Sequence, residues 1–244
     1  MHRNMIGKPI IEAHRGDSAN APENTIAAFR QAVELGIHSI ELDVHPTKDG
    51  ELVVMHDDNV TRTTDGQGEI ADLTLAEIRR LDAGSWFAAT FAGEAVPTLA
   101  EVFELLNGTS TRLNIEIKAS PASELVAMKL KSLLHRASEG HLVSSFDLGA
   151  LLAVREMTPN VTLAMLGSGQ ECLDLARENG FSWMNVHYKS VTNDLVAQAH
   201  ASGIRVMIWT LDDAALFEQY QQWGVDKICT NRPGMMLAEA EKLA

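Results

Sequence analysis

The chain has 244 residues, of which 45% are hydrophobic and 22% are charged, and its formal net charge at pH 7 is -13. This composition is typical of a soluble globular protein with enough apolar material for a core, and it argues against an intrinsically disordered chain. The acidic balance argues against nucleic acid or an anionic membrane as a partner, so any phosphate-binding site must be locally positive.

The N-terminal residues 1–14 lack the apolar stretch of a signal peptide, and no later run is long enough to span a membrane. Cys172 and Cys229 lie far apart in the sequence and lack the spacing of metal ligands, so we expect two reduced, partly buried thiols. These features predict a cytoplasmic protein without stable membrane association. They leave its oligomeric state open.

The first elements alternate between strand and helix. Apolar periodicity predicts a strand, a helix and a second strand over residues 10–14, 23–35 and 40–44. A turn at Asp49 and Gly50 then precedes a third strand over 52–55, which predicts a hairpin that delivers His56.

Residues 57–97 interrupt this alternation. They are rich in Thr, Gly and Asp, with one short helical stretch at 75–81, and we interpret them as an insertion that caps a pocket at one end of the fold and has no core of its own. From residue 98 the alternation resumes and continues to the end. The predicted helices cover 99–106, 123–136, 148–157, 170–179, 193–202, 214–223 and 233–243, and the predicted strands cover 112–118, 141–145, 161–165, 182–186, 205–209 and 227–229.

Together with the first two strand–helix pairs, these elements predict a (β/α)₈ barrel, formed by a single domain over residues 1–244 with the insertion after its second strand. An open, doubly wound sheet is the alternative. Such a sheet usually carries a glycine-rich phosphate fingerprint in its first turn, and HRGDSANAPEN at 14–24 does not fit GxGxxG.

Carboxylates recur on one face of two predicted strands. In residues 40–44 the apolar side chains alternate with Glu41 and Asp43, and a later strand places Glu116 and Lys118 on one face in the same way. Carboxylates side by side resist desolvation unless a cation or several donors lie nearby. Three carboxylates without cysteine form an oxygen ligand set, which suits Mg²⁺ or Ca²⁺.

Other polar candidates end neighbouring strands. His14 and Arg15 end the first strand and His56 follows the hairpin, so in a barrel they share the C-terminal mouth with the carboxylates. Two histidines beside a metal suit general acid–base catalysis near neutral pH, and Arg15 and Lys118 suit contacts with phosphate. The structural alternative is a network of ion pairs between the same acids and cations. His45 shares the face of the acids, and we interpret it as a structural histidine.

Short motifs are spread along the chain in a characteristic order. They are HRG at 14–16, PENT at 22–25, ELDV at 41–44, the DG turn at 49–50, HDD at 56–58, EIK at 116–118, SSFD at 144–147, WT at 209–210 and GVDKICTNRP at 224–233. Each is weak alone, but together they span nearly the whole chain. In this combination the chain resembles the glycerophosphodiester phosphodiesterase family.

The resemblance implies a (β/α)₈ barrel with a small insertion after the second strand. It also implies metal-assisted hydrolysis of small-molecule glycerophosphodiesters to glycerol 3-phosphate and an alcohol. The roles that it implies are metal ligands at Glu41, Asp43 and Glu116, an acid–base pair at His14 and His56, phosphate contacts at Arg15 and Lys118, and a pocket-lining aromatic at Trp209. Asn231 stands where many relatives have Asp, and we expect this departure to affect a barrel-closing contact alone.

Other functions fit parts of this pattern. A phospholipase D-like lyase that acts on lysophospholipids by internal attack shares the metal set, but such proteins are usually secreted and disulfide-bonded. A barrel that binds metal without catalysis would have no use for both His14 and His56. A sugar isomerase would usually need more carboxylates and a second metal. The sequence does not indicate the alcohol head group of the substrate.

Overall fold

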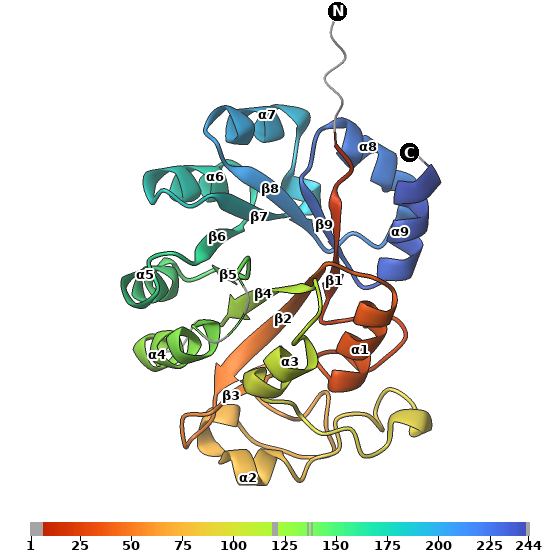
Figure 1. The fold of residues 1–244 in the computed structure, drawn as a ribbon, viewed down its shortest axis with the longest axis vertical. Helices are drawn as coiled ribbons and strands as arrows, with labels where there is room; N and C mark the ends of the chain where they lie inside the picture. The colour runs from red at the N-terminus through yellow and green to blue at the C-terminus, as the bar shows by residue number, and fades with distance from the viewer. Residues whose placement is uncertain (1–6, 119–121, 136, 138, 243–244) are drawn as a thin grey trace, which may run out of the picture.

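The structure is a computed structural model that describes residues 7–118, 122–135, 137 and 139–242. Eight parallel strands form a closed barrel, because β1 pairs with both β2 and β9 (Figure 1). The barrel strands are β1 (Ile10–His14), β2 (Ser39–Pro46), β4 (Arg112–Ile117), β5 (Leu142–Ser145), β6 (Thr162–Gly167), β7 (Trp183–His187), β8 (Arg205–Trp209) and β9 (Lys227–Thr230). The predicted barrel fold is therefore confirmed, and the doubly wound alternative is wrong.

Helices surround the strands, as Figure 1 shows. They are α1 (Ile26–Glu34), α3 (Leu99–Leu105), α4 (Ser123–Leu134), α5 (Leu148–Met157), α6 (Gly169–Glu178), α7 (Asn193–Ala201), α8 (Phe217–Gln222) and α9 (Pro233–Lys242). The helix predicted over 214–223 begins instead as a 3₁₀ turn at Ala214–Leu216, which Asp213 caps by accepting a hydrogen bond from the Ala215 amide. The remaining predicted elements differ from the observed ones only at their ends.

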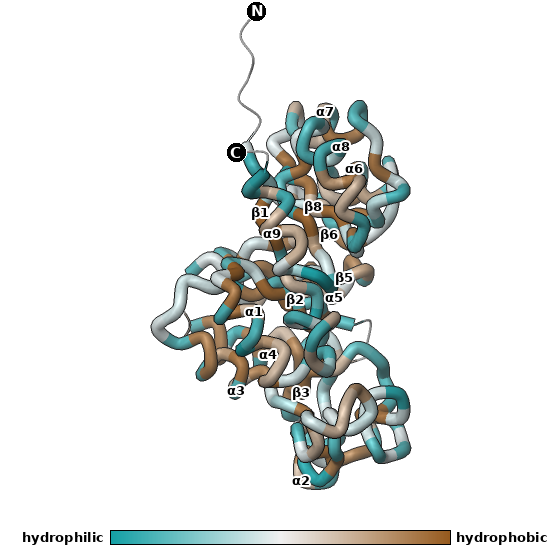
Figure 2. Tube along the Cα trace, turned by 90° about the vertical axis from the view of Figure 1, so that its right-hand side faces the viewer, coloured by the Kyte–Doolittle hydropathy of each residue, from teal (hydrophilic) through white to brown (hydrophobic). Residues whose placement is uncertain are grey.

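The outward face of the barrel strands packs against the helices. In β2, Ile40, Leu42 and Val44 are buried in this layer, so Glu41 and Asp43 point to the barrel interior. Figure 2 shows hydrophobic residues concentrated along the strands, while the helices carry both hydrophobic and hydrophilic stretches. Burial of the apolar outer face thus determines which side chains of β2 reach the interior.

A buried ion pair lies inside the barrel, towards the N-terminal ends of the strands. The Nζ atom of Lys227 lies 2.7 Å from Oε1 of Glu12 and 3.0 Å from Oγ of Ser39. Asn114 donates a hydrogen bond to the other oxygen of Glu12. Because both charges are paired and hydrogen-bonded, they are tolerated in the low-dielectric interior, and they form a satisfied polar layer beneath the C-terminal mouth.

The predicted hairpin is present, since β3 (Leu52–Val54) pairs antiparallel with β2. The segment that follows contains α2 (Leu75–Ile78) and two 3₁₀ turns, Ile70–Asp72 and Ala89–Phe91, and lies beside β3 and α3 at one edge of the barrel (Figure 1). It buries a small apolar cluster of its own against β3, so the expectation that the insertion has no core of its own is wrong. The buried members of this cluster are Val53, Met55, Val60, Ile70, Ile78, Ala83 and Val96.

Both cysteines are free and buried, as the sequence analysis predicted. Across the described ranges, each helix is too short or too polar to cross a membrane.

His141 gives the fold a testable pH dependence. It is buried, and its Nδ1 accepts a hydrogen bond from the Leu113 amide, so the fold requires the neutral ring. Burial, reinforced by Arg112, lowers the pKa of His141 from 6.5 to about 4. Because this pKa is lower in the folded than in the unfolded state, the unfolded chain binds the proton first as the pH falls. The fold therefore keeps its full stability above pH 6.5 and loses stability as the pH falls from 6.5 towards 4. Since one pKa unit corresponds to about 1.4 kcal/mol, the loss is at most about 3.5 kcal/mol.

We therefore predict that His141→Asn, whose amide oxygen can also accept from Leu113, flattens the pH dependence of unfolding in this range. Urea denaturation between pH 4 and 7 measures the effect. His38→Asn, at an exposed position, is the control and should follow the wild type. Parallel curves for His141→Asn and wild type would contradict the prediction.

Candidate active site

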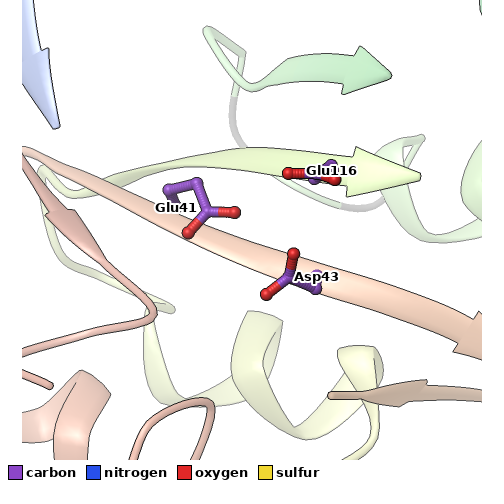
Figure 3. Close-up of side chains that lie close together, drawn as sticks. All are labelled: Glu41, Asp43 and Glu116. Carbon is purple, nitrogen blue, oxygen red and sulfur yellow. The ribbon is translucent and has the colours of Figure 1, made fainter. Parts of the chain in front are cut away.

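Three carboxylates converge at the C-terminal mouth of the barrel. Glu41 and Asp43 come from β2 and Glu116 from β4, where the parallel register pairs Asp43 with Glu116. Each of the three offers an oxygen, and these oxygens lie within 4.8 Å of one another. Figure 3 shows the three side chains pointing into one space from two adjacent strands. The structure therefore brings the predicted ligand set together.

The charge of this cluster is only partly compensated. Burial, together with Asp43 and Glu116, raises the pKa of Glu41 well above its usual value, and burial and Asp43 raise the pKa of Glu116 to about 7. For Asp43 burial acts in the same direction, but Lys118 and Arg15 outweigh it and lower the pKa. Within the described residues, Oε1 of Glu41 is buried without a hydrogen-bond partner. A further cation would satisfy this oxygen and the clustered charge.

Two basic residues contact the carboxylates. Nζ of Lys118 lies 2.6 Å from Oδ1 of Asp43 and also contacts Glu116. Nε of Arg15 lies 3.3 Å from Oδ2 of Asp43, and the Arg15 amide donates to Oε2 of Glu41. The ion-pair network considered as the structural alternative is thus present, but it leaves Glu41 incompletely paired. The two basic residues place positive charge beside the carboxylates but do not balance all three of them.

The loop after β1 is shaped to deliver Arg15. Arg15 and Gly16 both have positive φ, at 57° and 84°, and a Cβ atom on Gly16 would lie 2.7 Å from atoms of Ala28. Only glycine avoids this clash where the loop crosses α1. Asn24, also at positive φ, donates to Oδ2 of Asp43, and Thr25 caps α1. The HRG and PENT motifs therefore form one loop that reaches over the carboxylates.

His14 is held as a neutral ring. Its Nδ1 lies 2.7 Å from Oδ1 of Asn231, whose amide nitrogen donates to Asp212 and so directs the oxygen towards His14. An amide oxygen only accepts, so Nδ1 carries the proton and Nε2 is free, 3.9 Å from Oε2 of Glu41. Burial and the neighbouring Arg15 lower the pKa of His14 to about 4. The expectation that Asn231 affects only a barrel-closing contact is wrong, because it orients His14.

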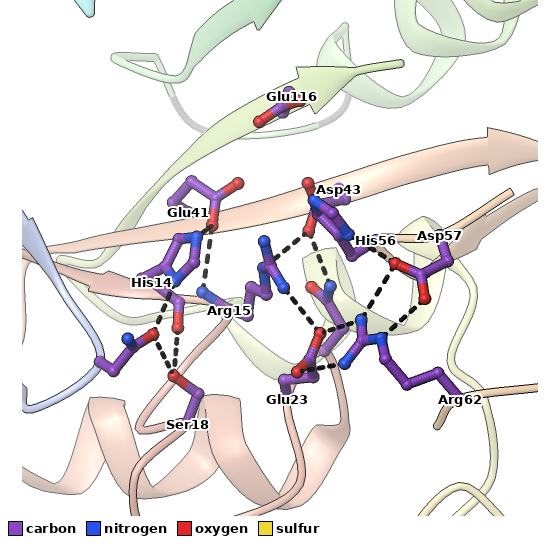
Figure 4. A network of polar contacts seen from close by, with 12 residues as sticks. His14, Arg15, Ser18, Glu23, Glu41, Asp43, His56, Asp57, Arg62 and Glu116 are labelled. Carbon is purple, nitrogen blue, oxygen red and sulfur yellow. Dashed lines mark hydrogen bonds and ion pairs between the residues drawn. The ribbon is translucent and has the colours of Figure 1, made fainter. Parts of the chain in front are cut away.

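His56 has a different environment. Its Nδ1 lies 2.7 Å from Oδ1 of Asp57, and its side chain is 37% exposed. The backbone carbonyl of His56 accepts a hydrogen bond from Nε2 of His45 at 3.1 Å. His45 thus supports the site without entering it, which agrees with its structural interpretation. Figure 4 shows His14 and His56 on either side of Arg15.

A cavity of about 200 Å³ lies between these groups. Its lining consists of His14, Arg15, Glu41, His56, Asn114, Glu116, Lys118, Ser144, Phe146, Leu166, Met207, Trp209, Thr210 and Cys229. Seven of the eight predicted site residues line it, and the eighth, Asp43, contacts two of the lining residues, Arg15 and Lys118. The rings of Phe146 and Trp209 meet edge to face, with centroids 5.7 Å apart, and form an apolar wall. In the described chain, residues 57–97 do not line this cavity, but Asp57 holds His56, which does. That these residues cap the pocket stays a prediction.

A larger hollow, of about 650 Å³, lies at the opposite end of the barrel. It is lined by the first residues of the strands, such as Ser39, Arg112 and Trp183, and contains none of the predicted site residues. The chemistry of the lining residues therefore favours the smaller cavity as the candidate active site.

Residues 14–235 match the model of the glycerophosphoryl diester phosphodiesterase family. The chain belongs to this family. The family, the barrel fold and the enzyme class predicted from the motifs are confirmed, and hydrolysis of glycerophosphodiesters is the activity that this membership assigns. The family depends on a divalent metal, and the carboxylate cluster of Glu41, Asp43 and Glu116 fits one.

Similar proteins support this membership. A glycerophosphodiester phosphodiesterase of Caldanaerobacter subterraneus subsp. tengcongensis is 41% identical, over 94% of this chain and 97% of its own length. A phosphodiesterase of Oleispira antarctica, solved in complex with the product sn-glycerol-3-phosphate, is 30% identical with a TM-score of 0.91, covering 96% of this chain and 97% of its own. A glycerophosphodiester phosphodiesterase from Agrobacterium tumefaciens has a TM-score of 0.83 at 28% identity, with 94% and 99% covered.

Several residues of the site were missed by the sequence analysis. Glu23, Asn24, Asp57 and Asn231 all lie inside quoted motifs, and their place in those motifs was the available signal. Arg62 lies outside those motifs, and its contacts with Glu23 and Asp57 follow only from the folded loop. These residues orient the side chains that the motifs made prominent.

The carboxylate cluster predicts a metal effect on stability. Mg²⁺ or Ca²⁺ should raise the free energy of unfolding, by about 2.7 kcal/mol at a free concentration a hundred times the dissociation constant. Glu41→Gln, which removes one charge at similar volume, should abolish this increase. Thermal unfolding with and without the ion measures it, with Glu51→Gln as a control at an exposed carboxylate paired to Lys129. An undiminished metal shift in Glu41→Gln would contradict the assignment.

Proposed function

We propose that the cavity at the C-terminal mouth hydrolyses glycerophosphodiesters to glycerol 3-phosphate and an alcohol. The observation that carries this proposal is the pairing of a neutral histidine and a carboxylate-bound histidine at one cavity beside three clustered carboxylates. The relatives named above carry phosphodiesterase names, and one was solved with sn-glycerol-3-phosphate, so we propose hydrolysis rather than a lyase reaction.

The metal ligands in this proposal are Glu41, Asp43 and Glu116. The donor set is entirely oxygen, which suits Mg²⁺ or Ca²⁺ rather than a softer ion. When bound, the cation neutralises negative charge on the phosphate oxygens as the reaction proceeds. It also offsets the repulsion that raises the pKa of Glu41 and Glu116.

Arg15 and Lys118 provide the phosphate contacts. Both line the cavity, and each has fewer than all of its N–H donors committed to carboxylates. The guanidinium of Arg15 is fixed from both sides, by Glu23 at 2.8 Å and by Asp43 at 3.3 Å. This fixed orientation places positive charge at the cavity before substrate arrives, which is the arrangement that stabilises charge in a transition state.

His14 is the general base and His56 the general acid. Nε2 of His14 is unprotonated and accepts the proton of the nucleophile, which is water or the glycerol hydroxyl next to the ester. His56, whose Nδ1 is held by Asp57, donates a proton to the leaving alcohol oxygen. The nucleophile's oxygen forms a bond to phosphorus as the bond from phosphorus to the leaving oxygen breaks, and the proton taken up by His14 balances the one given by His56. Attack by water gives glycerol 3-phosphate directly; attack by the glycerol hydroxyl gives a cyclic phosphate, which water then opens to glycerol 3-phosphate with the two histidines in reversed roles. The different partners of the two rings support this division.

The apolar wall of Trp209 and Phe146 faces the organic part of the substrate in this proposal. The small cavity suits a small-molecule diester, and the acidic surface disfavours nucleic acid and anionic membranes. Two buried free thiols agree with a cytoplasmic location.

An assay coupled to glycerol 3-phosphate tests the activity. Purified protein should release glycerol 3-phosphate from a panel of choline, ethanolamine, glycerol and inositol diesters. Exhaustive chelation should abolish turnover, and Mg²⁺ or Ca²⁺ should restore it. Full turnover after chelation would refute the metal assignment, and inactivity on the whole panel with metal would refute the substrate class.

The two histidines should differ in their dependence on the leaving group. Each His→Ala change should reduce turnover of an alkyl diester by a factor of about 10²–10⁴. A nitrophenol leaving group departs without a proton, so it should rescue His56→Ala and leave His14→Ala impaired. Steady-state kinetics with both substrates measure this. Equal rescue of both variants, or rescue of His14→Ala alone, would overturn the assigned roles.

A further inference from the structure

A second arginine, Arg62, connects the residue that holds the proposed acid His56 to the residue that holds the proposed phosphate contact Arg15. Arg62 donates to Asp57 through Nε at 2.7 Å and Nη2 at 3.1 Å, and to Glu23 through Nη1 and Nη2, both at 2.9 Å. Glu23 in turn holds Arg15, and Asp57 holds His56. Figure 4 shows the alternating chain of arginines and carboxylates that runs from His56 to Asp43.

The geometry of Arg62 is specific to a guanidinium. Its planar fork binds two carboxylates at once, each through two N–H donors, which a lysine ammonium cannot reproduce. The hydrogen bonds from Arg62 are the foremost cause of a lowered pKa at Asp57, which therefore stays an acceptor for His56. Arg62 comes from the segment after His56 and Glu23 from the loop after β1, so the fork also ties the two segments together.

The solvent exposure of the Arg62 and His56 side chains argues against a purely structural role for the network. The side chains of Arg62 and His56 are 44% and 37% exposed. Exposed ion pairs contribute little to stability, about 0–1 kcal/mol, so the network is not needed to hold the fold. The backbone of His56 is already held by His45, whereas the orientation of its ring depends on Asp57. The consequence of losing Arg62 should therefore fall on the ring of His56.

We propose that Arg62 is a positioning residue for the general acid. It fixes the carboxylate of Asp57 against Nδ1 of His56, so that the protonated Nε2 faces the leaving oxygen. Its hydrogen bonds to Glu23 fix the position of Asp57 and His56 relative to Arg15. The proposal rests on the proposed role of His56 and adds the residue that makes its ring orientation unique.

The test compares Arg62→Lys, which keeps the charge and loses the fork, with His56→Ala. The substrates are glycerophosphocholine and a glycerol phosphodiester of p-nitrophenol. Arg62→Lys should lower kcat on glycerophosphocholine by about 10- to 100-fold, less than removal of the acid itself, and change kcat on the nitrophenyl diester less than about twofold. Its melting temperature should match the wild type. Arg79→Lys, in a pair with Glu101 of similar exposure, is the matched control and should leave both rates unchanged.

A double-mutant cycle checks that Arg62 acts through Asp57. In the Asp57→Asn background the further change Arg62→Lys should have almost no effect on glycerophosphocholine, because the positioned carboxylate is already lost. Additive losses, or an equal loss on both substrates, would overturn the proposal. A fully active Arg62→Lys would also overturn it. If His56→Ala itself retained full activity on glycerophosphocholine, the proposed function of His56 would fail instead.

Discussion

The site depends on one electrostatic constraint, which is the concentration of three carboxylates at one end of the barrel. The register of β2 and β4 forces Glu41, Asp43 and Glu116 together, since their apolar neighbours must face the helices. In a desolvated interior such a cluster is unfavourable without positive charge. Lys118 and Arg15 supply part of that charge, and among the described residues Oε1 of Glu41 has no hydrogen-bond partner. The need for a further cation follows from this imbalance.

The two histidines share a cavity and differ in what their Nδ1 atoms meet. An amide oxygen, from Asn231, fixes the tautomer of His14 and adds no charge, so burial and Arg15 keep that ring neutral. A carboxylate, from Asp57, holds Nδ1 of His56. The proposed division into base and acid follows from this difference in partners and from no difference between the rings themselves. It resembles the general way in which enzymes assign acid and base roles, by placing similar groups in unlike environments.

Much of this arrangement could be predicted from the sequence because strand periodicity and motif order are local signals. The alternation around Glu41 and Asp43 predicted their shared face, and the strand–helix repeat predicted the barrel. The contacts of Asn231 with His14 join residues 217 positions apart, and no local pattern encodes them. The segment 57–97 was predicted as an insertion, but its apolar cluster and its position beside the pocket depend on packing against β3. Arg62 was overlooked because its two partners meet only when the loops fold together.

The central claim, that the three carboxylates form a cation site serving the histidine pair, is tested most directly by crystallography with Mn²⁺ and anomalous scattering, since Mn²⁺ prefers the same oxygen ligands. The account predicts an anomalous peak bound by Glu41, Asp43 and Glu116, with Lys118 moved away from Asp43. An ion bound elsewhere, with Lys118 still seated on Asp43 and Glu116, would contradict it.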